Sequence, residues 1–190
     1  MSVASEGKAS AKAEALRFFE LCLTCTPYLV VMSHQQEWKG RAWARKVFNR
    51  NALEAAADWT LDEMSGVEAY VPAARPHYYW EGMAAVVKLP ASRAVDLASF
   101  PVQPSFAVSY GESLLQAVWL LNDKGERFEA RSLSQAIARR LGGGAAARLR
   151  VPGTKHSSEE QRAKLILAHE LPHACHDVQA ALRRVRARSR

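Results

Sequence analysis

Two nearly continuous apolar runs dominate the hydrophobic pattern of the chain. The first covers residues 83–89, between Gly82 and Pro90, and the second covers residues 115–121. Short apolar runs bounded by turn residues are typical of strands buried on both faces. The β-prone segment 105–110 precedes the second run, and a Gly-Glu-Ser turn leads from one to the other. The sequence therefore predicts a central β-hairpin beside a further buried strand.

Gln116 is the one strongly polar residue within the second run. Alternate side chains of a strand point to opposite faces, so we expect Gln116 and Trp119 on opposite faces of the sheet. We interpret Trp119 as part of the core. Gln116 has two interpretations: a buried amide bonded to a neighbouring strand, or a polar contact within a binding site.

Helical and strand patterns alternate along the rest of the chain without an internal repeat. This alternation predicts an α/β or α+β fold with one central sheet. Residues 1–10 are expected to form a flexible tail, residues 11–156 one α/β domain, and residues 157–190 C-terminal helices with a basic end. The predicted helices cover residues 11–24, 34–50, 51–59, 92–99 and 132–141, and the other predicted strands cover residues 28–32 and 67–71.

The positive charge is concentrated at one end of the chain. A length of 190 residues with 48% apolar and 24% charged residues is typical of one globular domain. The formal net charge is +7, but five arginines lie among the last eight residues, and removing them leaves +2. This end is either a solvated helix end or a phosphate-contacting segment that includes Arg183 and Arg184. Segment 34–50, where basic and aromatic residues interleave, is either an amphipathic helix or a second phosphate-contacting face.

The cysteines and the N-terminal segment bear on the cellular compartment. Cys22, Cys25 and Cys175 are too few for a disulfide framework, and we expect free thiols. The first twelve residues are polar and lack the apolar region of a secretory signal. No apolar run approaches the length of a membrane-spanning helix. These features favour a cytoplasmic location.

Residues 169–173 read His-Glu-Leu-Pro-His and match the HExxH zinc-binding pattern. That pattern needs both histidines on one face of a continuous helix. Pro172 would remove a backbone hydrogen bond inside a helix, so we expect a break near Leu171 and a last helix from Pro172. The sequence therefore argues against a zinc protease and favours histidines at a solvated helix end. The alternative is a structural metal site built from His169, His173, Cys175 and His176.

Four segments follow one another in a characteristic order. They are Tyr-Val-Pro-Ala at residues 70–73, the apolar run 83–89, the hairpin 104–119 that ends in Gln-Ala-Val-Trp, and Arg-Val-Pro-Gly-Thr at residues 150–154. This order resembles the archaeo-eukaryotic primase-polymerase superfamily, especially its RepB-type plasmid primase domains. The resemblance spans residues 66–156, about half of the chain. It implies a nucleotidyl-transfer site on an RRM-like, mixed or antiparallel sheet flanked by helices.

The chain departs from that superfamily at the metal-binding positions. Its enzymes carry two acidic residues on the strand that matches residues 83–89, and a third after the helix before the Arg-x-Pro-Gly-Thr segment. These carboxylates hold two divalent ions during nucleotidyl transfer. Here residues 86–89 read Val-Val-Lys-Leu and residues 142–147 read Gly-Gly-Gly-Ala-Ala-Ala, so no acid stands at either place. A lysine would repel a divalent ion. The nearest acids that could substitute are Glu81, Asp96 and Glu112.

The sequence thus predicts a catalytically degenerate, primase-like protein that binds nucleic acid, with no catalytic residue, metal or other cofactor of its own. DNA is favoured over RNA, and the expected role is that of an accessory subunit in plasmid or mobile-element replication or in another nucleoprotein complex. Two alternatives are an active primase that uses Mg²⁺ or Mn²⁺ held by other acids, and a protein–protein scaffold that does not bind nucleic acid. The residues predicted to contact phosphate or nucleic acid are Lys88, Gln116, Arg148, Arg150, Thr154, Lys155, His156, Arg183 and Arg184.

Overall fold

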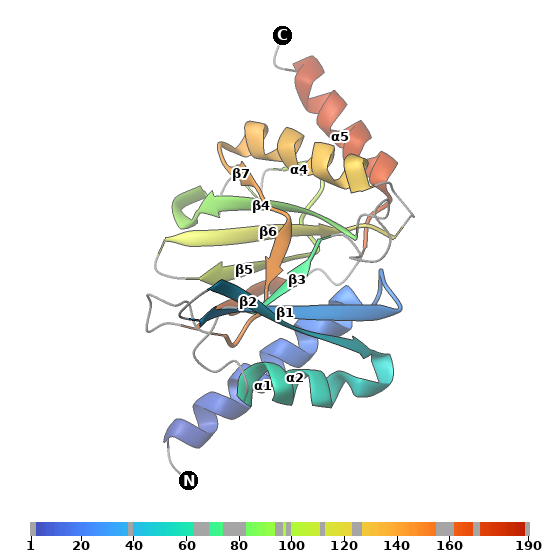
Figure 1. Cartoon of the computed structure of the whole chain (residues 1–190). Helices are drawn as coiled ribbons and strands as arrows, with labels where there is room; N and C mark the ends of the chain where they lie inside the picture. Colours follow the sequence, from blue (N-terminus) through green and yellow to red (C-terminus); the bar gives the residue numbers. More distant parts are fainter. Residues whose placement is uncertain are drawn as a thin grey trace.

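In the part of the chain that it describes, the computed structural model has two antiparallel β-sheets and four α-helices (Figure 1). It describes residues 3–37, 40–62, 69–73, 83–93, 97, 100–110, 113–122, 127–154, 162–168 and 172–188. The helices are α1 (Val3–Cys22), α2 (Leu53–Asp62), α4 (Arg127–Leu141) and α5 (Cys175–Arg188), with short 3-10 turns η1 (Arg50–Ala52) and η2 (Ala91–Arg93). None of these helices is long and apolar enough to cross a membrane.

One sheet has four strands in the order β2-β1-β3-β8, and the other has five in the order β7-β4-β6-β5-β9. The strands are β1 (Tyr28–Glu37), β2 (Gly40–Asn49), β3 (Ala69–Pro72), β4 (Ala84–Pro90), β5 (Phe106–Tyr110), β6 (Leu114–Leu120), β7 (Gly144–Ala145), β8 (Arg148–Arg150) and β9 (Lys164–Ala168). The predicted α/β class is confirmed, but the strands form two sheets rather than one.

The predicted hairpin β5–β6 is confirmed at the centre of the five-stranded sheet. Strand β6 pairs with β5 on one side and with β4 on the other. Trp119 is fully buried, its ring lies edge-on to Phe100 at 5.6 Å between centroids, and its indole N–H donates to the Val102 carbonyl at 2.8 Å. Trp119 is therefore a core residue, as expected, on the face opposite to that of Gln116.

Two hydrophobic cores lie on the two faces of the five-stranded sheet. Helices α4 and α5 cover one face, where Ala85, Val87 and Trp119 contribute to the core. The opposite face shares its core with α1, α2 and the four-stranded sheet. In this second core Phe18 of α1 packs edge-to-face on Phe106 of β5, with 5.5 Å between ring centroids. Figure 1 shows the result as layers, with α4 above β4 and with α1 and α2 at the opposite end of the molecule.

The helix predicted over residues 34–50 is wrong. Strands β1 and β2 form a hairpin here, with continuous register from Tyr28 opposite Asn49 to Glu37 opposite Gly40. The β-branched pair Val30 and Val47 fits a strand better than a helix, and long-range pairing outweighs the local helical pattern. Trp38 and Lys39 lie outside the described residues.

The two chain ends also differ from expectation. Helix α1 begins at Val3, so most of the segment expected to be a flexible tail is helical. The apolar run that includes Leu165 and Ile166 is strand β9, not a helix, and it pairs with β5. A short apolar run does not by itself distinguish a buried helix from a strand. Residues 157–190 therefore do not form a purely helical extension, because β9 belongs to the five-stranded sheet.

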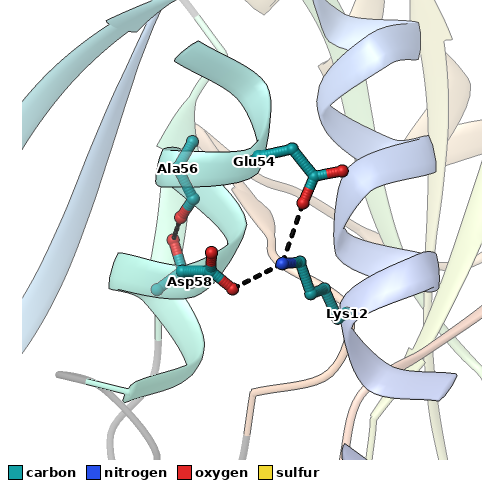
Figure 2. Close-up of polar contacts among 5 residues, drawn as sticks. Lys12, Glu54, Ala56 and Asp58 are labelled. Carbon is teal, nitrogen blue, oxygen red and sulfur yellow. Dashed lines mark hydrogen bonds and ion pairs between the residues drawn. The ribbon is translucent and has the colours of Figure 1, made fainter. Parts of the chain in front are cut away.

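Lys12 joins the two helices beside the four-stranded sheet (Figure 2). Its ammonium nitrogen on α1 lies 2.7 Å from Asp58 and 2.8 Å from Glu54, both on α2. The Asp58 hydrogen bond, followed by that of Glu54, raises the pKa of Lys12 above its usual value. Lys12 therefore stays protonated in the folded chain throughout the neutral and mildly alkaline range.

Burial raises the pKa of the Cys22 thiol well above its ordinary value of 9.0, with Cys25 adding to the effect. In an unfolded chain the thiol would ionise near that ordinary value, so the unfolded state binds fewer protons above it. We therefore expect the free energy of unfolding to fall by about 1.4 kcal/mol per pH unit above about pH 9. Urea titrations of wild type and Cys22→Val at several alkaline pH values will measure the difference in slope. A Cys25→Ser control should keep the wild-type slope, and equal slopes in all three proteins would contradict the assignment.

Candidate nucleic-acid interface

Lys88 and Gln116 occupy directly opposite positions on β4 and β6. Opposed side chains of an antiparallel pair lie on the same face, and here it is the face that carries Val86 and Val118 toward the four-stranded sheet. Lys88 is exposed although Val87 and Leu89 on either side of it are buried. The core between the sheets therefore ends at an exposed lysine.

Gln116 connects the two sheets through its side-chain amide. The amide nitrogen donates to the carbonyl of Arg148 at 3.0 Å, and the amide oxygen accepts from the backbone N–H of Arg150 at 2.8 Å. Both partners belong to β8, the edge strand of the four-stranded sheet. The side chain is 1% exposed, so these bonds form in a nearly dry environment. Gln116 is thus a buried amide bonded to a neighbouring strand, which is one of the two interpretations of the sequence.

Two arginines of β8 lie in different environments. Arg150 is only 2% exposed, and its guanidinium carbon lies 5.5 Å from the centroid of the Tyr110 ring at the end of β5. This is a cation–π contact in a largely desolvated place. Arg148, two residues earlier, is exposed. We refer to Lys88, Tyr110, Gln116, Arg148 and Arg150 together as the sheet junction.

The segment after β8 is held tightly by backbone contacts. The Thr154 hydroxyl donates to the Val151 carbonyl at 2.7 Å, and the side chain is 1% exposed. Gly153 has a φ of +84°, and a β-carbon there would lie 2.8 Å from the carbonyl oxygen of Ala11 on α1. Only glycine combines that backbone conformation with so close an approach. The Arg-Val-Pro-Gly-Thr segment therefore docks on α1 and fixes the position of β8.

Strand β7 lies beside β4 at the sheet junction. Gly144 is opposite Lys88 and Ala145 is opposite Val87. The two places where the resemblance in sequence implies metal-binding acids are thus neighbours in space, and both lack an acid here. A β-carbon at Gly143 would lie 2.4 Å from the Lys88 carbonyl oxygen, so even a small side chain is excluded at that position.

Carboxylates are missing well beyond these two places. None of the strands from β3 to β9, as the structure describes them, carries an Asp or Glu. Within the described part of the chain no group of three or more His, Cys, Asp or Glu residues could hold a metal ion. The substitute acids Glu81, Asp96 and Glu112 lie outside the described residues.

Comparison with solved structures gives three strong matches. The catalytic domain of primase RepB′ in complex with initiator DNA superimposes with a TM-score of 0.68 at 13% identity, covering 93% of this chain and 97% of that one. The AEP domain of the cyanophage S-2L primase-polymerase gives a TM-score of 0.64 at 11% identity, covering 90% and 97%. A second structure of primase RepB′ gives 0.66 at 12% identity, covering 92% of this chain and 64% of that one. The chain has a primase-polymerase fold.

Comparison of the sequence with known families and proteins finds no match. No family model matches the chain, and no curated protein matches it. At 11–13% identity the shared primase-polymerase fold is established by backbone geometry. The fold predicted from four short segments is therefore confirmed, while the roles of individual residues in this chain rest on their own surroundings.

The structure brings together only part of the predicted contact set. The sheet junction brings together Lys88, Gln116, Arg148 and Arg150. Thr154 lies in the segment that follows β8 and donates to the Val151 carbonyl. Lys155 and His156 lie outside the described residues. Arg183 and Arg184 belong to α5, which covers the other face of the five-stranded sheet, and the side chain of Arg184 is not described.

The HExxH segment does not form a continuous helix. Strand β9 ends at Ala168 and α5 begins at Cys175, three residues after the start expected at Pro172. The backbone of His173 is extended and pairs with Leu121 of the primase-polymerase core. The zinc-protease geometry is thus absent at His173, while His169 and Glu170 lie outside the described residues.

Tyr110 is a residue of the sheet junction that sequence reasoning missed. It ends the β-prone segment 105–110 and has the pattern of an ordinary strand end, so no local signal marks its contact with Arg150. The contact depends on β8 of one sheet reaching β5 and β6 of the other. Such a long-range contact follows from the tertiary structure and not from local spacing.

Replacing Gln116 by methionine should destabilise the chain because two backbone groups of β8 would lose their partners. A buried group left without a hydrogen bond costs about 1–3 kcal/mol, so we expect a loss of about 2–4 kcal/mol in the free energy of unfolding. Urea unfolding of wild type and Gln116→Met will measure it. The matched control, Gln135→Met on the exposed side of α4, should change stability by less than about 0.5 kcal/mol. A Gln116→Met protein as stable as that control would contradict the bridging role.

Proposed function

We propose that this chain is a primase-like protein that binds nucleic acid without catalysing nucleotidyl transfer. The observation that carries the proposal is the meeting of β4 and β7, where Lys88 and Gly144 face each other and the neighbouring strands bear no carboxylate. Two-metal nucleotidyl transfer needs acidic oxygen ligands at the reacting phosphates. A cation in that position favours the phosphate group itself over a metal ion.

The exposed cations of the sheet junction support nucleic acid as the ligand. Lys88 and Arg148 are both exposed, and Gln116 connects the strands that carry them. Lysine and arginine at such an edge contact the sugar–phosphate backbone without reading its sequence. One structure with the same fold is a complex with initiator DNA, which favours DNA over RNA. The proposed setting is an accessory role in plasmid or mobile-element replication or in a related nucleoprotein complex.

The buried residues of the predicted contact set take a different part in this proposal. Arg150, Gln116 and Thr154 are at most 2% exposed, so they position β8 and the segment that follows it. Lys88 and Arg148 make the direct phosphate contacts, with Lys155 and His156 extending them along the chain. At binding sites, buried residues commonly hold in place the exposed residues that contact the ligand.

Neutralising the two exposed cations should weaken binding of single-stranded DNA and reduce its salt dependence. Each lost phosphate contact lowers the slope of log K against log salt by about 0.7, so Lys88→Gln with Arg148→Gln should lower it by about 1.4. Fluorescence anisotropy with a labelled oligonucleotide across a salt series measures this slope. The matched control removes two exposed cations elsewhere, Arg17→Gln and Lys164→Gln, and should keep a slope near that of wild type. Absence of salt-dependent binding in wild type would favour the scaffold alternative.

The proposal also predicts that binding does not depend on divalent metal. Adding EDTA should leave the affinity for DNA unchanged, because phosphate is held by lysine and arginine. A primer-synthesis assay with Mg²⁺ or Mn²⁺ and purified protein should yield no template-dependent product. The opposite outcome is template-dependent synthesis that Lys88→Gln leaves unchanged and that mutation of Glu81, Asp96 or Glu112 abolishes. That result would show an active primase with substitute acids.

A further inference from the structure

Two neighbouring helices account for most of the net positive charge of this chain. Helix α4 contains four arginines and one glutamate, and α5 contains four arginines and one aspartate. Each helix thus has a formal charge of +3, and together they account for +6 of the chain's +7. In the sequence, the most visible cluster of positive charge is the C-terminal run of arginines. The structure shows that α4, which has the same formal charge as α5, lies next to it.

Arginines from the two helices converge on one hollow. Arg140 of α4 and Arg183 of α5 are exposed, and both line a hollow of about 230 Å³ between the helices. The other polar lining residues are Ser132 and Gln179, which can donate hydrogen bonds. Among the described residues, no carboxylate lines the hollow. Four donors around one concave place, two of them permanently charged, suit a phosphate group.

A second hollow beside α1 shows why the absence of an acid matters. Arg17 and Arg50 line that hollow too, but Glu20 lines it with them and bonds Arg17 at 2.9 Å. Arg50 donates to the Leu23 carbonyl at 3.3 Å and so helps to cap α1. Both cations there already interact with groups of the chain. The hollow between α4 and α5 is therefore the better anion site.

We infer that the α4–α5 surface, defined by Arg140, Arg183, Ser132 and Gln179, is a second binding surface for the sugar–phosphate backbone of a nucleic acid. It goes beyond the proposed function because it lies over a different face of the five-stranded sheet. The sheet junction opens on the face shared with the four-stranded sheet, whereas α4 and α5 cover the other face (Figure 1). The two surfaces are thus separated by the sheet, and one chain can hold two segments of polynucleotide.

The charge density favours nucleic acid over an acidic protein segment as the occupant. Regularly spaced phosphates offer one negative charge per nucleotide, which matches arginines repeated along both helices. The guanidinium group also binds phosphate through two parallel hydrogen bonds. Leu133, Ala136 and Leu182 line the hollow as well, so an acidic peptide with apolar side chains is the competing ligand that the experiment must distinguish.

The test neutralises the arginines that line the hollow and leaves the core intact. Arg140→Gln with Arg183→Gln alters two exposed side chains, so the fold should survive, as circular dichroism and urea unfolding will verify. Fluorescence anisotropy with the same single-stranded oligonucleotide should show a slope of log K against log salt lower by about 1.4. The Arg17→Gln and Lys164→Gln protein, which loses the same charge elsewhere, should keep a slope near that of wild type.

A capture assay tests whether the two surfaces act together. Wild-type protein on a bead-bound oligonucleotide should retain a second, fluorescent oligonucleotide. The Arg140→Gln, Arg183→Gln protein and the Lys88→Gln, Arg148→Gln protein should each bind one oligonucleotide and lose most capture of the second. A slope and a capture equal to those of the control would overturn the inference.

The outcomes separate this inference from the proposed function. If only the Arg140→Gln, Arg183→Gln protein loses salt-dependent binding, the α4–α5 surface binds nucleic acid and the sheet junction does not. If only the Lys88→Gln, Arg148→Gln protein loses it, the sheet junction stands and the inference fails. Labelled polyglutamate is the probe for the competing ligand. If wild type binds it and the Arg140→Gln, Arg183→Gln protein does not, while DNA binding is unchanged, the surface takes acidic protein segments and the inference is wrong.

Discussion

The two hydrogen bonds of the Gln116 amide hold the two sheets of this protein in register. They join the middle of β6 to the backbone of β8 at 2.8 and 3.0 Å, in a place almost closed to water. Because a glutamine amide supplies one donor and one acceptor group, it can satisfy a carbonyl and an N–H two residues apart on the same strand. The position of β8 then sets where Arg148 is exposed and where Arg150 packs on Tyr110. The sheet junction depends on this one side chain.

The other constraint is the close approach of β7 to β4. Gly143 leaves no room for a side chain against the Lys88 carbonyl, and Gly144 and Ala145 pair with Lys88 and Val87. Small residues thus line the edge at which an enzyme of this fold would need carboxylates. The electrostatics at this edge underlie our proposal that the chain binds phosphate without catalysing nucleotidyl transfer.

The charge distribution gives the molecule two basic regions of different character. The sheet junction combines a few cations with a rigid, largely buried framework. The α4–α5 surface includes two exposed arginines, on two helices that together have a formal charge of +6. Nucleic-acid binding by phosphate contact needs little more than positioned cations, which is why we propose it for this chain. The match to the catalytic domain of primase RepB′, at 13% identity, shows that this chain shares its fold.

The sequence alone determined the strands that are continuous and apolar, the hairpin β5–β6, the opposite faces of Gln116 and Trp119, and the missing acids, because these depend on local pattern and residue type. It also carried enough of the order of segments to predict the primase-polymerase fold. The β1–β2 hairpin, strand β9 and the contact of Tyr110 with Arg150 were decided by tertiary structure. Strand β9 and the Tyr110–Arg150 contact depend on residues far away in the chain, and the β1–β2 hairpin depends on cross-strand pairing. In each case the pairing outweighs weak local propensity. The same holds for the shared arginine surface, since no spacing in the sequence places Arg140 beside Arg183.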